Sequence, residues 1–413
     1  MSGLLLGGRR GGALIAATAV ASAGLSLLSQ VLAERALGAA GFAHWSHLNA
    51  LLLLAVPLGC LGSNHLLLSE HARGRLQHRA GLMSALRFYG MCLAVSLPLF
   101  LLAGAWRLGD EDRFSTPLLA LLFLGNALAV LLFPVFQISS RATAVALWPL
   151  AQVSLRALAG ALALALTWSA STLAWAWGLG LVLLGAVGLV SVMPLARQWA
   201  SEPQAATAPP SQASLLRQAG VFGASDMLDT LDLKLIIPLA ALWHGSAATA
   251  AAGIVVVMLS AVVFLPSVLV SRVLLPAVHR EGLQSPTLRH WVTRVSAAAA
   301  VGLLPVAAAL GGWGPDLVAA VARGNYAAQS DAFRLVGLCL LPLSLSMLGA
   351  APFMAHREAA RLLRWRLEAL AVFLVLAVVI RDHGLASLLW AMAGGRLWLT
   401  LRTLTTLYRA KAP

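Results

Sequence analysis

Apolar stretches of about bilayer-spanning length fill the chain, and no other feature restricts its fold as strongly. The 413 residues are 60% hydrophobic and 11% charged, with a mean hydropathy of +0.85, far more apolar than an average soluble domain. Each stretch is close to the ~20 residues that cross a bilayer core. We therefore expect an all-α integral membrane protein with about twelve spans: residues 12–33, 43–66, 83–105, 117–138, 145–167, 171–193, 218–241, 250–276, 295–313, 332–354, 365–380 and 385–404.

The distribution of basic residues predicts the orientation, because cytoplasmic loops are enriched in Lys and Arg. With the N-terminus inside, the inward loops and tails hold sixteen basic residues and the outward loops five, while seven acids, Glu34 among them, fall outward. Both termini are then cytoplasmic. The net charge is +14, and most of the excess basic residues fall in the cytoplasmic loops, next to the membrane face that carries anionic lipid. Membrane lipids are therefore the expected partner, and nucleic acid is not.

A polar segment divides the chain into two halves of six spans. Residues 200–214 are rich in Pro, Ala and Ser and predict a cytoplasmic linker between bundles at 1–199 and 215–413. The halves are weakly alike: Gly38 precedes a span with Pro57, and Gly245 precedes one with Pro266. This predicts parallel repeats about an axis along the membrane normal, with a working site between the halves near the midplane.

The seventh span carries an unusual cluster of charges. Asp226, Asp229 and Asp232 follow one another at helical spacing, with Lys234 close by. Each ionisable group at a helix centre costs ~2.5–3.5 kcal/mol, so groups inside the protein must compensate them. One interpretation is a hydrated face that binds protons, sodium ions or substrate hydroxyls, and the other is a set of interhelical salt bridges that positions the helix.

The other polar residues within spans also allow two interpretations. Arg156 lies near the middle of the fifth span with Gln152 one turn earlier, and it suits either an anionic substrate or an Asp of the seventh span. Arg396 and Arg334 are candidates for a cationic cavity. Snorkelling to headgroups is expected of Arg87, Arg272, Arg366 and Arg402. A stripe in the first span could line the cleft or pack against a helix; it comprises Ser22, Ser26, Ser29 and Gln30.

Enzymatic function has little support in the sequence. The two lysines, Lys234 and Lys411, follow no Walker glycine loop, so ATP hydrolysis by that device is excluded. The three cysteines all fall in apolar spans and do not suggest a metal or disulfide framework. One alternative is a membrane-embedded glycosyltransferase, since the outward residues 110–112, Asp-Glu-Asp, are similar to the acidic loop of such enzymes.

The chain resembles the oligosaccharide flippases of the multidrug/oligosaccharidyl-lipid/polysaccharide (MOP) exporter superfamily, and most closely their O-antigen (Wzx-type) branch. The resemblance covers nearly the whole chain. It rests on the six-plus-six layout and on residues 37–42, 57–62, Arg141, Arg156, 228–234, 245–253 and 320–326.

This resemblance implies two six-helix bundles related by a pseudo-two-fold axis. It implies movement of undecaprenyl-pyrophosphate-linked oligosaccharide across a bacterial inner membrane by alternating access, without cofactor. Arg156 and Lys234 would be cavity cations, and Asp226, Asp229 and Asp232 would couple transport to protons or sodium. A polysaccharide polymerase and a chain-length regulator are the implied partners. A multidrug or cation antiporter of the same superfamily (MATE type) is the alternative.

Overall fold

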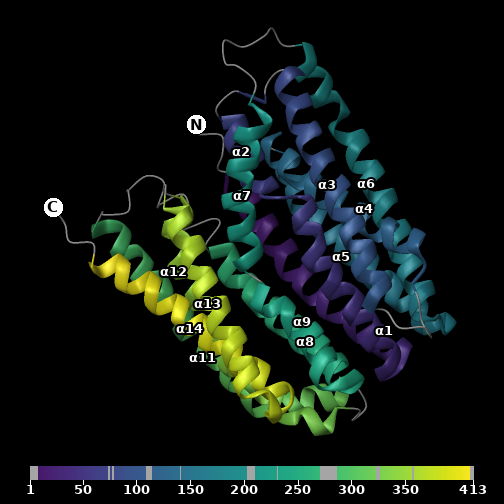
Figure 1. The fold of residues 1–413 in the computed structure, drawn as a ribbon, viewed down its shortest axis with the longest axis vertical. Coiled ribbons are helices and arrows are strands. Elements are labelled where there is room, and N and C mark those ends of the chain that lie inside the picture. Colours follow the sequence, from purple (N-terminus) through teal and green to yellow (C-terminus); the bar gives the residue numbers. More distant parts are fainter. Residues whose placement is uncertain are drawn as a thin grey trace. The chain divides into compact units, whose positions relative to one another are not determined.

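The structure is a computed structural model that describes residues 8–72, 75–76, 79–107, 114–139, 141–201, 210–229, 231–269, 286–321, 326–355 and 358–409. Within these residues the regular elements are helices (Figure 1). They divide into two compact units: Met1–Leu37 with Leu48–Met227, and Gly38–His47 with Leu228–Pro413.

The first unit contains most of the helices from the N-terminal half. Their bounds are α1 Gly8–Gly59, α2 Ser63–Ala72, α3 Arg79–Arg107, α4 Thr116–Ile138, α5 Ala142–Leu166, α6 Ala170–Ser201 and α7 Gln212–Asp229. Helix α4 packs on α6, where Gly185 and Gly188 leave room: a Cβ on Gly188 would lie 2.6 Å from the ring of Trp148 and 2.7 Å from Leu132. Small residues at such contacts let membrane helices approach closely.

The second unit contains α8 Leu231–Trp243, α9 Gly245–Leu269, α11 Pro286–Val321, α12 Ser330–Ala355, α13 Ala359–Val379 and α14 Leu385–Arg409. Helix α14 packs against α8, α12 and α13, and Figure 1 shows it alongside α13. The contact between α13 and α14 is tight, because a Cβ on Gly395 would lie 2.7 Å from the carbonyl oxygen of Ala369.

The predicted all-helical membrane fold is confirmed. Helices lie in each predicted span, although residues 270–276 of the eighth span lie outside the described part of the chain. Among the described residues eight helices are long and apolar enough to cross a membrane. The seventh span is formed by α7 and α8, and the short α2 was not predicted. The charged α13 and α14 are not among the eight. Residues 110–112 and most of the 200–214 linker lie outside the described residues.

A connecting loop was expected between the first two spans, over residues 34–42, and the structure has a shorter break there. Within α1 two helices meet at a kink at Gly38, which has the non-helical φ 66° and ψ 178°. Gly245 precedes α9 and also has a positive φ of 80°. Glycine adopts such φ values readily because it lacks a Cβ. The two glycines that begin the weak sequence repeat therefore share a left-handed backbone.

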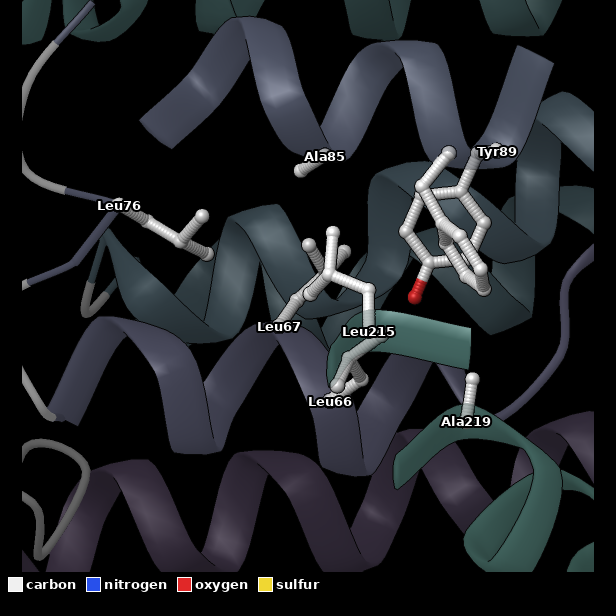
Figure 2. Close-up of a cluster of buried hydrophobic side chains, with 8 residues drawn as sticks. Leu66, Leu67, Leu76, Ala85, Tyr89, Leu215 and Ala219 are labelled. Carbon is white, nitrogen blue, oxygen red and sulfur yellow. The ribbon is translucent and has the colours of Figure 1, made fainter. Parts of the chain in front are cut away.

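The first half of α7 is held inside the first unit by a hydrophobic cluster. Figure 2 shows Leu215 and Ala219 of α7 facing Leu66 and Leu67 of α2 and Tyr89 of α3. The start of α7 is also fixed by the side chain of Gln212, which donates to the Ser84 carbonyl at 3.0 Å. The first compact unit accordingly includes residues as far as Met227, beyond the predicted boundary at 215.

Candidate functional site

Two aspartates and two arginines form a buried ion-pair cluster in the second unit. Asp229 is the last residue of α7, Asp232 lies in the first turn of α8, Arg366 is on α13 and Arg396 is near the middle of α14. Asp232, Arg366 and Arg396 are 7%, 2% and 3% exposed. The compensation expected for the aspartates thus comes from helices far along the chain.

A two-point contact joins Arg396 and Asp232. Arg396 Nε donates to Asp232 Oδ2 and Nη2 donates to Oδ1, both at 2.6 Å. Two parallel charge-assisted hydrogen bonds of this kind fix geometry as well as charge. Arg396 Nη2 also donates to the backbone carbonyl of Asp229, and Nη1 approaches Ser346 Oγ of α12 at 3.4 Å.

Arg366 is the counter-ion of Asp229. Its Nη2 donates to Asp229 Oδ1 at 2.7 Å and lies 3.9 Å from the sulfur of Met354. Snorkelling was expected for this arginine, and that expectation is wrong: with α14 and α12 packed around α13, the guanidinium is buried and points to a carboxylate. Arg402 pairs with Glu368 at 3.0 Å and stacks on Trp398.

The cluster also replaces a backbone hydrogen bond. In a continuous helix the carbonyl of Asp229 would accept from the N–H of Leu233, four residues on. Here that carbonyl accepts from Arg396, and the Leu233 N–H donates to Asp232 Oδ1 at 2.9 Å. Groups freed where a membrane helix ends must be satisfied by neighbours. The cluster does this while placing a cation at the C-terminus of α7 and an anion at the N-terminus of α8, both favourable.

A small pocket opens beside the cluster within the second unit. Its volume is about 10 Å³, and its lining is Leu228, Asp232, Arg366, Ala369, Leu370, Arg396 and Leu399. Ligand sites for drug-sized molecules measure roughly 300–1,000 Å³. This pocket is therefore too small for an oligosaccharide.

Arg156, in the first unit, has a different environment. Its guanidinium carbon lies 4.3 Å from the centre of the Trp177 ring, a cation–π contact between α5 and α6. Within the part of the chain that the structure describes, Arg156 has no carboxylate within 4.0 Å and belongs to no ion pair. Gln152, one turn earlier on α5, is half-buried like Arg156. Asp229 and Asp232 have arginine partners of their own.

The polar stripe of the first span is mostly covered by protein. Ser22 and Gln30 are each 7% exposed and Ser26 is half-buried. Ser22 Oγ donates to the carbonyl of Thr18, within the same helix. Gly160 of α5 packs against this part of α1, since a Cβ there would lie 3.3 Å from the Ser29 carbonyl oxygen. Of the two roles expected, helix packing fits this burial better.

The remaining predicted residues lie outside the cluster. Arg334 is exposed, near the start of α12, and approaches only Asp331 at 3.9 Å among the described carboxylates. It precedes Ser346 by twelve residues on α12, about 18 Å at 1.5 Å per residue. Lys234 is half-buried on α8. The side chain of Asp226 lies outside the described residues.

Sequence reasoning missed three buried charges among the described residues: Arg366, Glu34 and Glu70, the last of which is 0% exposed and pairs with Arg75 at 3.4 Å. Arg366 was assigned to the lipid headgroup region. It lies close to the end of a predicted span, and from that position alone a side chain that reaches the headgroups cannot be distinguished from one that is buried in the protein. Glu34 was expected in an outward loop but lies inside α1 and is 3% exposed. Its position between two apolar runs was the only available signal. The break at Gly38 is shorter than the expected loop, so Glu34 lies in the last turn of the helix before it.

Comparison with solved structures identifies the architecture. The inward-facing form of a multidrug resistance MATE family transporter of the MOP superfamily matches with a TM-score of 0.68 at 14% identity, covering 95% of each chain. The chain has the MATE transporter fold. A eukaryotic MATE transporter matches at 0.67 and 14% identity, over 97% of this chain and 95% of its own.

A third MATE-fold match is a MOP superfamily transporter from Pyrococcus furiosus. Its TM-score is 0.65 at 13% identity, with 99% of this chain and 98% of that chain covered. No family profile matches the sequence, and no curated protein does. The expected MATE-like arrangement is thus confirmed for the fold, and the chain is a multi-pass membrane protein.

Proposed function

We propose that the protein is a transporter that moves an anionic, pyrophosphate-linked lipid oligosaccharide across a bacterial inner membrane by alternating access. Both termini would be cytoplasmic, and a polymerase and chain-length regulator would act on the product. The MATE transporter fold supports a membrane transporter. The choice of an anionic substrate rests on the environment of Arg156.

Arg156 is a cation held within an apolar helix without a carboxylate partner in the described structure. A charge at such depth is costly and marks substrate or ion pathways by default. The Trp177 ring offers the guanidinium a favourable surface. The N–H donors of Arg156 make no hydrogen bond to any described residue, and their planar fork suits bidentate binding of phosphate oxygens. The arginines of the second unit differ, because Arg366 and Arg396 already bind carboxylates.

The test is flipping of a fluorescent undecaprenyl-pyrophosphate-linked oligosaccharide in proteoliposomes, with outer-leaflet label quenched by a membrane-impermeant reductant. Arg156→Ala should reduce the flipping rate about tenfold or more, the loss expected for hydrogen bonds to a charged group. Arg156→Lys should keep part of the rate, because it retains the charge without the planar fork.

The matched control is Arg402→Ala. Arg402 also stacks on a tryptophan, at 4.9 Å from the Trp398 ring, but it is partly exposed and paired with Glu368. Its removal should leave flipping within twofold of the wild-type rate. Wild-type vesicles that flip no faster than protein-free vesicles would contradict the proposal, as would full activity of Arg156→Ala.

A MATE-type cation antiporter is the second candidate, and the buried Glu34 favours it. Glu34 is 3% exposed and lies one turn before the kink at Gly38, and a buried acid in an apolar segment suits the binding of a cation or a proton. In the same vesicles this function predicts efflux of an organic cation driven by a proton or sodium gradient. Glu34→Gln should abolish that efflux, and Arg156→Ala should not.

A further inference from the structure

Oxygen atoms from several elements surround the guanidinium of Arg396. Both carboxylate oxygens of Asp232 lie at 2.6 Å, the carbonyl of Asp229 accepts from Nη2, and Ser346 Oγ lies at 3.4 Å. Asp229 Oδ1 is 3.8 Å from Nη1. The set therefore combines two carboxylates, a backbone carbonyl and a hydroxyl around one positive group.

Such a set of oxygens is what a hard metal cation prefers. In transporters with discontinuous helices, the carbonyls at the C-terminal end of a half-helix coordinate the coupling ion. The carbonyl of Asp229 ends α7 in this way. In this chain the position is filled by a cation that belongs to α14 and cannot leave.

The charges of the four described side chains balance without a second cation. Arg366 neutralises Asp229 and Arg396 neutralises Asp232, so these four groups sum to zero. A sodium ion would add an unbalanced positive charge in a region of low dielectric, which is costly. Sodium would also have to displace the guanidinium of Arg396, which makes two hydrogen bonds to Asp232 and is covalently attached to α14.

We propose that Arg396 is a tethered cation that takes the place of a coupling metal ion at Asp229 and Asp232. Sodium binding at these aspartates then does not drive transport by this protein. This replaces the sodium coupling expected from the sequence, where the aspartates had only Lys234 nearby. The inference goes beyond the proposed function, because it concerns the energy source and holds for any solute.

The wild-type protein provides the first test. Its melting temperature in detergent is measured in sodium chloride and in choline chloride at equal ionic strength. Because the position is already filled, the two values should agree within about 1 °C. A ligand that binds only the native state raises stability in proportion to the logarithm of its concentration. A sodium-specific, saturable rise in the wild-type melting temperature would overturn the proposal.

Removal of the tethered cation provides the second test. Arg396→Ala should melt at a lower temperature in choline and recover by about 2 °C or more as sodium replaces it, because sodium then occupies the vacated oxygens. Arg396→Lys, which keeps a tethered charge, should show no sodium response. Arg396→Ala combined with Asp232→Asn should lose the response, since one carboxylate is gone.

Recovery of the Arg396→Ala protein is itself informative. If it is obtained folded only in sodium, the result supports the proposal. Two results would contradict the proposal. In one, Arg396→Ala aggregates in both salts while Arg396→Ala combined with Asp232→Asn folds. In the other, Arg396→Ala folds and its melting temperature does not depend on sodium. None of these measurements uses a transported solute, so their failure is distinguishable from failure of the flipping test.

Discussion

At the residue scale, the four charges of the second unit show what a single sequence can and cannot reveal. The cost of ionisable groups in a membrane helix predicted that Asp229 and Asp232 must be compensated, and this is confirmed. The partners were not predictable, because Arg396 lies 164 residues from Asp232. Its two hydrogen bonds depend on how α14 packs against α8, which no local pattern encodes.

The pair of Arg366 and Asp229 yields a prediction for stability. Arg366→Met should lower the free energy of unfolding by about 3–5 kcal/mol, because it leaves a carboxylate in the cluster without its main partner. Adding Asp229→Asn should restore most of that loss. Reversible denaturation in mixed micelles measures both changes.

The control for this pair is Arg361→Met. Arg361 contacts Glu358 at 3.1 Å, but its side chain is 51% exposed, and exposed pairs contribute about 0–1 kcal/mol. A loss as large as that of Arg366→Met would show that burial is not the cause. If Asp229→Asn does not restore the stability lost in Arg366→Met, the two residues are not energetically coupled and the prediction is contradicted.

His244, between α8 and α9, predicts a pH dependence. Burial lowers the pKa of its imidazole, opposed more weakly by the charge of Asp382. The unfolded chain then binds a proton more readily than the folded one, so stability is lost as pH falls through about 6.5, the ordinary value. His244→Gln should reduce this loss. Thermal melts between neutral and mildly acidic pH measure it, and identical pH profiles for the two proteins would contradict it.

At the scale of elements, the helices were predictable and their ends were not. Apolar length predicted where helices lie, because only helices of about 20 residues satisfy their own backbone across a bilayer. Eight of these helices are apolar enough to cross a membrane among the described residues, and the more charged α13 and α14 are not. The break between the first two spans was expected as a loop over 34–42 and is a kink at Gly38, since Gly and Ala runs look alike in turns and in bent helices. The division of the seventh span into α7 and α8 was also missed, because side chains from distant helices satisfy its backbone.

The contact between α13 and α14 gives a prediction at this scale. Gly395→Ala should destabilise the protein by about 1–3 kcal/mol, because the added Cβ would lie 2.7 Å from a backbone oxygen of Ala369 and the helices must separate. The matched control is Gly394→Ala, whose Cβ meets only the end of the Leu376 side chain. A smaller effect at Gly395 than at Gly394 would contradict this packing. Unfolding in mixed micelles provides the measurement.

At the scale of the whole molecule, the hydropathy and the fold agree, and the direction of insertion remains a prediction. The bias of sixteen basic residues against five places the 200–214 linker in the cytoplasm. Reporters that require the periplasm should therefore be active when inserted at 106–116 or 314–331 and silent at 200–214. An active periplasmic reporter at 200–214 would show that the linker is outside and that the predicted orientation is wrong.

The segment Gly38–His47 belongs to the second unit although it is made early. Phe42 and Ser46 lie against Gly253 of α9, where a Cβ would be 2.3 Å from Ser46 Oγ. During synthesis these residues leave the ribosome some two hundred positions before their neighbours in α9. Until α9 is synthesised, residues 38–47 lack the helix against which they pack. A C-terminal half expressed alone would lack these residues, and the surface of α9 around Gly253 would be uncovered. The second compact unit is therefore drawn from both halves of the chain.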